Sequence, residues 1–330
     1  MIVKFFGKTY PITIIVITII AILTQLPCII FPERFFGMSE SDSPIMSLIR
    51  YVYNFSPIIT SLILLICFLA CLLLVSRINT NNFLISKASL LPPIIFALLF
   101  QFQLYNPALI ANMLILISIN RLLNLTSKDN DNHSEVDFFA AGFMVGIATL
   151  TDLSAVIFLL FIIIAVFVID TSYRFRDVLI IITGFTLPII IWLFIEFAAG
   201  NIEKLTTQFD PIFVNFEIFK NNISIFDYAI IIYYAVLIIF SIGFVVKRLH
   251  TMSLAIRNKY TFIIIILFIS LILVVLLNNP VIYIMMAIPL LSIILSYTLT
   301  NIKTIWADIF FCLIAVLPLF HLLIEFNVNA

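Results

Sequence analysis

The chain has 330 residues, of which 64% are hydrophobic and 10% are charged, whereas about 25% are charged in an average soluble domain. This composition excludes a soluble globular protein and predicts an all-α polytopic membrane protein, because the apolar runs are continuous and lack the alternation of outer-membrane barrel strands. The formal net charge is zero, so we expect no nucleic-acid partner.

The apolar runs predict about eleven membrane segments within a single integral membrane domain, 1–330. A helix needs roughly 20 apolar residues to cross a bilayer, and some of the runs are shorter and lie in close pairs. We therefore interpret 89–104 with 107–120, and 138–151 with 153–169, as two short, shallow hairpins. The runs centre on residues 11–31, 57–75, 89–104, 107–120, 138–151, 153–169, 178–199, 226–246, 261–278, 281–300 and 305–324.

The loop after the first helix, residues 31–56, contains most of the candidate site. Glu40 and Asp42 are candidate catalytic groups, either as a general base or as ligands of a divalent metal. Arg34 and Arg50 are candidate ligands of a lipid phosphate. The alternative is that these residues are solvated loop charges. No histidine or cysteine spacing typical of a metal site is present.

The same loop also predicts a helix lying on the membrane surface. Ser43 is suited to cap it, with Pro44 at the first helical position. Apolar residues then recur at helical spacing, which is typical of an interfacial amphipathic helix. They are Ile45, Leu48, Ile49 and Val52.

The second hairpin contains an acidic residue near its turn and two glycines in its first arm. A carboxylate at membrane depth must face water or a polar partner, so we assign Asp152 to the substrate site. The alternative is a turn residue at headgroup level. Gly142 and Gly146 fall on one helix face, where their spacing allows another helix to pack closely.

Lysine and arginine predict the orientation, because cytoplasmic loops of membrane proteins are enriched in both. With a cytoplasmic N-terminus and alternating segments, thirteen basic residues fall on the cytoplasmic side and four on the other. The C-terminus is then periplasmic. The four residues on the outer side are Arg34, Arg50, Lys204 and Lys220.

The layout resembles the C-type membrane glycosyltransferases. The residues that carry this resemblance are the acidic first loop, Gly142-Phe-Met-Val-Gly146-Ile-Ala148, and the late segment Asn279-Pro280 to Pro289. The resemblance implies a glycosyltransferase-like module over 1–200, followed by variable helices over 201–330. It also implies an inner-membrane enzyme of cell-envelope biogenesis that takes a sugar from polyprenyl phosphate at the outer face.

Two departures from this pattern concern the candidate site. The acidic pair Glu40 and Asp42 lies late in the loop, and Asp152 stands where many of these enzymes have a basic residue.

The chain is also similar to an uncharacterised inner-membrane family of the Bacteroidetes. The matching residues include Asn120-Arg121, Asp137, Arg174-x-Arg176-Asp177 and Gly184-x-x-x-Pro188. This similarity implies fold and location but no activity. Two other functions therefore stay open: a non-catalytic scaffold or subunit that docks membrane-protein partners through Gly142 and Gly146, and, third, a transporter or lipid flippase.

Overall fold

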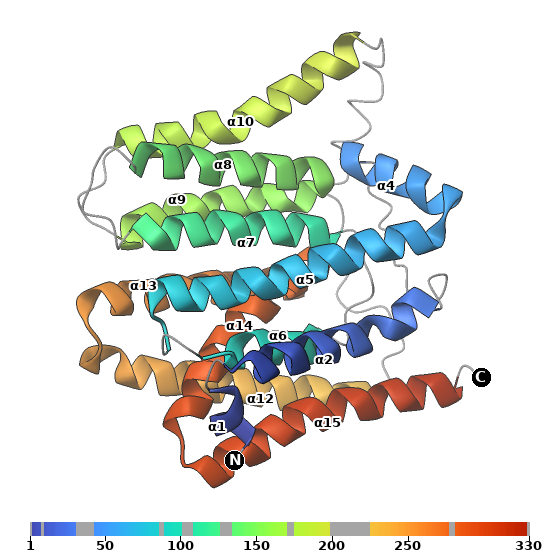
Figure 1. Cartoon of the computed structure of the whole chain (residues 1–330). Coiled ribbons are helices and arrows are strands. Elements are labelled where there is room, and N and C mark those ends of the chain that lie inside the picture. The colour runs from blue at the N-terminus through green and yellow to red at the C-terminus, as the bar shows by residue number, and fades with distance from the viewer. Residues whose placement is uncertain are drawn as a thin grey trace.

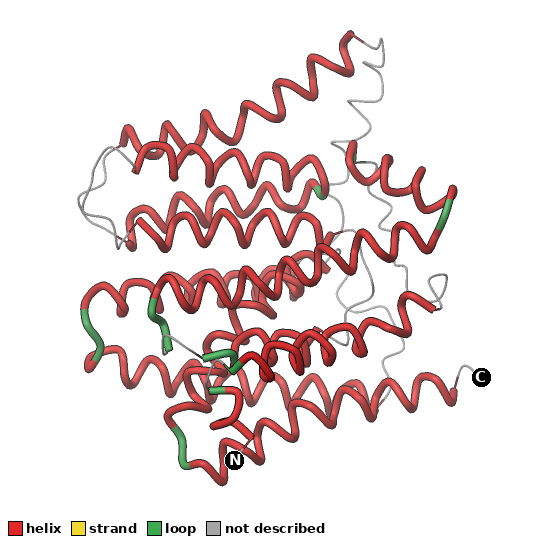
Figure 2. Tube along the Cα trace, in the orientation of Figure 1, coloured by secondary structure: helices red, strands yellow, loops and turns green. Residues whose placement is uncertain are grey.

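The computed structural model describes residues 2–7, 10–30, 43–85, 89–100, 108–125, 134–169, 175–198, 225–276 and 281–328. Within these ranges the chain is almost entirely helical and contains no strand, as Figure 2 shows. The predicted all-α class is therefore confirmed.

Each of the eleven predicted apolar runs coincides with a helix. Run 153–169 corresponds to a short 3-10 helix, η3, followed by α9. The elements are α1 (Ile2–Phe6), α2 (Pro11–Ile30), α4 (Pro44–Phe55), α5 (Pro57–Asn82), α6 (Leu91–Leu99), α7 (Ala108–Leu125), α8 (Ser134–Thr151), η3 (Leu153–Val156), α9 (Ile157–Ile169), α10 (Phe175–Ala198), α12 (Ile225–Arg248), η5 (Leu249–Thr251), α13 (Leu254–Leu276), α14 (Val281–Asn301) and α15 (Thr304–Val328).

The structure supports a membrane protein but only part of the predicted number of membrane segments. Within the described ranges, five helices have the length and apolar composition to cross a membrane, and the total of about eleven segments, short hairpin arms included, stays a prediction. They are Pro57–Asn82, Ala108–Leu125, Phe175–Ala198, Leu254–Val274 and Ile282–Asn301. Shorter apolar helices cover Pro11–Leu26, Leu153–Ile164 and Thr304–Val316.

The helices of the first predicted hairpin differ in length. Helix α6 has nine residues and is about 14 Å long at a rise of 1.5 Å per residue. Helix α7 has 18 residues and is itself a candidate span. Only one arm of this pair is therefore short, because the second helix continues to Leu125, five residues beyond the predicted run.

Helix α14 lies at the centre of the bundle. It packs against α5, α6, α7, α12, α13 and α15, and 89% of its candidate span is buried inside the protein. Pro289 lies within this helix. The buried apolar cluster runs from Val3 to Ile314, so residues of both chain halves belong to one core.

One end of the bundle carries most of the described basic residues, and we call it the basic end. Helices α5, α7, α12 and α14 finish there, and α8, α10, α13 and α15 start there (Figure 1). Helix α2 also starts at this end, whereas α15 finishes at the opposite end. The basic residues in these terminal turns and connections are Arg77, Arg121, Arg176, Lys247, Arg248, Arg257, Lys259 and Lys303.

Helix α4 lies across the end opposite the basic end, beside the last turn of α8 (Figure 1). The predicted start is confirmed, because Ser43 is the N-cap and Pro44 begins the helix. The predicted apolar residues line a small hollow of about 110 Å³ against α5. Tyr51 and Phe55 are 75% and 81% exposed, so α4 also presents aromatic side chains outward.

Candidate functional site

The turn between α8 and α9 is built around Asp152. This residue has an extended backbone conformation and is the N-cap of η3. Its carboxylate accepts a hydrogen bond from the backbone N–H of Ser154 at 3.0 Å. Asp152 is only 2% exposed, so the carboxylate stabilises the turn from inside the protein.

Two residues from distant elements bind the backbone of this turn. The hydroxyl of Ser43, at the start of α4, donates to the carbonyl oxygen of Thr151 at 2.5 Å. The hydroxyl of Tyr283, at the start of α14, donates to the carbonyl oxygen of Ser154 at 3.0 Å. We call these five residues, Ser43, Thr151, Asp152, Ser154 and Tyr283, the tip cluster.

A small hollow borders the tip cluster at Ser43. The hollow between Ser43, Thr149 and Trp192 has a volume of about 20 Å³, enough for a single water molecule. Burial raises the pKa of the Asp152 carboxyl, which lies outside the five candidate spans, and the hydrogen bonds from Ser154 act against this shift. The structure therefore gives Asp152 an internal partner, and its burial does not suit direct contact with a substrate.

The other predicted site residues are only partly covered by the structure. Glu40, Asp42 and Arg34 lie outside the described residues. Arg50 is on α4 and is partly buried. Within the described residues, no group of three or more His, Cys, Asp or Glu side chains could hold a metal ion.

Gly142 and Gly146 face α10 of the same chain. A Cβ atom at Gly142 would overlap the carbonyl oxygen of Ile181, and one at Gly146 would lie 2.5 Å from the carbonyl oxygen of Phe185. Gly184 on α10 makes the reciprocal close approach to Phe139 on α8. The surface that we expected to dock a partner helix is therefore occupied by α10.

At the basic end, ion pairs join α8 to α10 and also to α7. Arg121 on α7 contacts Asp137 on α8 at 3.1 Å, and Arg176 on α10 contacts Glu135 on α8. Asp137 is 3% exposed, so its carboxylate is buried beside this arginine. Arg121, Asp137 and Arg176, which belong to the segments that carry the family similarity, thus help to hold α7, α8 and α10 together.

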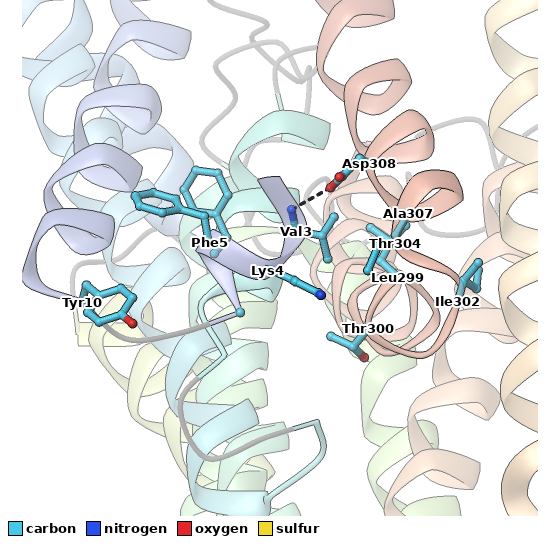
Figure 3. Close-up of a pocket in the computed structure, with 12 residues that line it drawn as sticks. Val3, Lys4, Phe5, Tyr10, Leu299, Thr300, Ile302, Thr304, Ala307 and Asp308 are labelled. Carbon is cyan, nitrogen blue, oxygen red and sulfur yellow. Dashed lines mark hydrogen bonds between the residues drawn. The ribbon is translucent and has the colours of Figure 1, made fainter. Parts of the chain in front are cut away.

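A larger pocket, which sequence reasoning missed, lies beside α1. It has a volume of about 860 Å³ and lies between α1, the end of α14 and the start of α15 (Figure 3). The backbone N–H of Val3 donates to Asp308 of α15 at 3.0 Å and anchors α1 at the pocket wall. No sequence pattern signals this pocket, because its walls come from opposite ends of the chain.

Comparison with known proteins gives a family and no individual relative. No curated protein and no solved structure matches the chain. One family model, described as "Family of unknown function (DUF6427)", matches residues 44–327. This match covers most of the chain, including the tip cluster apart from Ser43, the α8–α10 contact and the ion pairs. The chain belongs to the DUF6427 family.

Proposed function

We propose that the protein is a membrane enzyme of cell-envelope biogenesis, which transfers a sugar from a polyprenyl-phosphate donor at the end of the bundle opposite the basic end. The distribution of basic residues supports placing this end at the outer face of a bacterial inner membrane, because cytoplasmic ends are enriched in Lys and Arg.

The observation that carries this proposal is the hydrogen bond from Ser43 to Thr151. Ser43 directly follows Asp42, the candidate base, and Thr151 directly precedes Asp152. The bond thus joins the end of the acidic loop to the hairpin turn that the sequence assigned to the same site. This contact supports the proposal that the two parts of the candidate site, more than a hundred residues apart, lie near each other.

The proposed roles follow from the charge and chemistry of the side chains. Asp42 or Glu40 accepts the proton of the acceptor hydroxyl, whose oxygen then bonds to the anomeric carbon of the sugar. The bond from this carbon to the phosphate oxygen breaks, and polyprenyl phosphate leaves with the bonding electron pair. Arg34 and Arg50 hold the phosphate. Asp152 is a positioning residue that maintains the turn.

The test uses full-length protein in inner-membrane vesicles with a radiolabelled polyprenyl-phosphate sugar. We expect the double variant Glu40→Gln, Asp42→Asn to leave the labelled donor unconsumed, with protein present at the wild-type level. Asp177→Asn, which removes a carboxylate at the basic end, is the matched control. Wild-type consumption by the double variant would refute the proposed chemistry.

A second candidate function is a non-catalytic membrane subunit, and one observation favours it. An apolar groove of about 620 Å³ runs between α12 and α13, and a Cβ atom at Gly243 would meet no atom within 4 Å. Small residues at such positions allow helices of a partner to approach closely in lipid. We expect Gly243→Leu to remove a co-purifying membrane protein in this case, while donor consumption in the vesicle assay is absent in the wild type too.

A further inference from the structure

The pocket beside α1 has the composition of a binding site for an amphiphile. Its volume of about 860 Å³ falls within the range of about 300–1,000 Å³ that is typical of ligand sites. Its walls are mainly apolar, with Phe5 and Phe6 on one side and Leu299 and Ala307 on the other. Polar groups are confined to a few side chains, which is the usual arrangement where orientation of an apolar ligand matters.

The charged side chains that line this pocket are Lys4 and Asp308, of which Lys4 is the more exposed. Lys4 lines the pocket, is exposed, and makes no ion pair with any described residue. Figure 3 shows its side chain pointing toward Thr300 at the end of α14. Asp308 also lines the pocket, and its Oδ1 accepts the backbone N–H of Val3, so this carboxylate serves to hold α1.

Hydroxyl groups line the pocket, and further cations lie near the end of α14 without lining it. Thr300 and Thr304 line it and are exposed. Lys303, between these two threonines, is exposed as well. Arg248 donates to the side-chain oxygen of Asn301 at 2.5 Å, which places a third cation next to the end of α14. An anionic oxygen group is the chemistry that this combination of ammonium groups and hydroxyls attracts.

Exposed aromatic side chains indicate the level in the membrane at which the pocket lies. Tyr10 and Trp306 are 47% and 56% exposed, and Phe5 is 43% exposed. Tryptophan and tyrosine concentrate where a membrane meets water, at the level of the lipid headgroups. A pocket at this level with apolar walls and an exposed lysine complements a lipid that has an anionic phosphate above its acyl chains.

We propose that the pocket beside α1 binds one anionic phospholipid, with its phosphate at Lys4 and its acyl chains against the apolar wall. This site is separate from the tip cluster, which lies at the opposite end of the bundle. It does not depend on the proposed sugar transfer.

Native mass spectrometry of full-length protein from nanodiscs with equal phosphatidylglycerol and phosphatidylethanolamine tests the proposal. We expect the wild type to retain phosphatidylglycerol preferentially. Lys4→Gln should lower this preference by about threefold, the effect of losing one exposed charge contact, and Lys4→Arg should preserve it. Lys247→Gln, which removes an exposed cation of the basic end that does not line the pocket, is the matched control and should have no effect.

Two further measurements distinguish the contribution of the apolar wall to lipid binding from that of the lipid headgroup. Thr304→Phe, at an exposed position, should fill part of the pocket and reduce the amount of both retained lipids. Soluble glycerol phosphate should leave the retained lipid in place, because it does not replace the apolar contacts. Equal retention of both lipids by the wild type, an unchanged ratio in Lys4→Gln, or displacement by glycerol phosphate alone would overturn the proposal.

Discussion

The hydroxyl of Ser43 and the carbonyl oxygen of Thr151 are 2.5 Å apart, although 108 positions separate the two residues in the chain. This hydrogen bond fastens the start of α4 to the last turn of α8. Ser43 is fully buried, so water does not compete for the contact. The bond replaces the usual capping role, because the Ser43 side chain makes no capping hydrogen bond to α4 itself.

We expect Ser43→Ala to loosen α4 from the hairpin turn. The substitution leaves a buried carbonyl oxygen without this donor and should lower the stability by about 1–3 kcal/mol. Thermal unfolding of the detergent-solubilised protein measures this change. Ser47→Ala is the control, because the exposed Ser47 hydroxyl donates only to Pro44 of its own helix. Equal effects of both substitutions would contradict this role of Ser43.

The two substitutions Asp152→Asn and Asp152→Ala should separate capping from charge. Asparagine keeps an oxygen that can accept the Ser154 N–H, whereas alanine removes the cap and should cost about 0.5–2 kcal/mol. We expect the asparagine variant to melt at or above the wild-type temperature at neutral pH, and the alanine variant to melt below it. An asparagine variant that melts below the wild type would show that the charge itself stabilises the turn.

The pH dependence of Asp152→Asn follows from the raised pKa of the Asp152 carboxyl. The folded state binds the proton more tightly than the unfolded state, so wild-type stability falls as pH rises from 3.8, the ordinary value, through the folded pKa. Asparagine lacks this titration. We therefore expect the stability advantage of the asparagine variant at neutral pH to shrink as pH falls through that window, as measured by melting temperature.

We expect Gly142→Leu and Gly146→Leu to separate α8 from α10. Even a Cβ atom overlaps the facing backbone at both positions, and backbone cannot rotate away as a side chain can. Overpacking of this kind costs about 1–3 kcal/mol or more. Gly243→Leu is the matched control, since a Cβ atom there meets open space. Melting temperature and a cysteine crosslink between α8 and α10 would report the loss, and comparable stability of all three variants would contradict it.

Asn112 and Asn79 should respond in opposite directions to replacement by leucine. Both are fully buried, but neither the nitrogen nor the oxygen of the Asn112 amide has a hydrogen-bond partner in the described part of the chain. Asn79 donates to the carbonyl oxygen of Ser89 and accepts the N–H of Ile85.

Asn112→Leu should therefore stabilise the protein by relieving an unsatisfied amide, and Asn79→Leu should destabilise it by about 1–3 kcal/mol. Chemical or thermal unfolding in the same detergent checks both signs. A lower stability of Asn112→Leu would mean that this amide has a partner in the native membrane, such as an internal water molecule.

The amino-acid sequence by itself determined the helices. Their apolar runs are continuous, and a chain in lipid must satisfy its backbone hydrogen bonds within each segment, so the local sequence suffices to predict a helix. The start of α4 at Pro44 and the turn at Asp152 could also be predicted from local sequence, because a helix cap or a helix break depends on a few neighbouring residues.

Only the tertiary structure decided which partner each distinctive residue meets. The spacing of Gly142 and Gly146 predicts a close helix contact, but their geometry toward α10 depends on how the bundle packs. Asp152 turned out to be enclosed because Ser43 and Tyr283 close over its turn from elements 108 and 129 positions away. The pocket at Lys4 likewise exists because α1 packs against α15, near the other end of the chain. Helix formation depends on hydrogen bonds between residues that are close in sequence. A site depends on packing between segments that are far apart in sequence, and no short sequence pattern predicts which segments will meet.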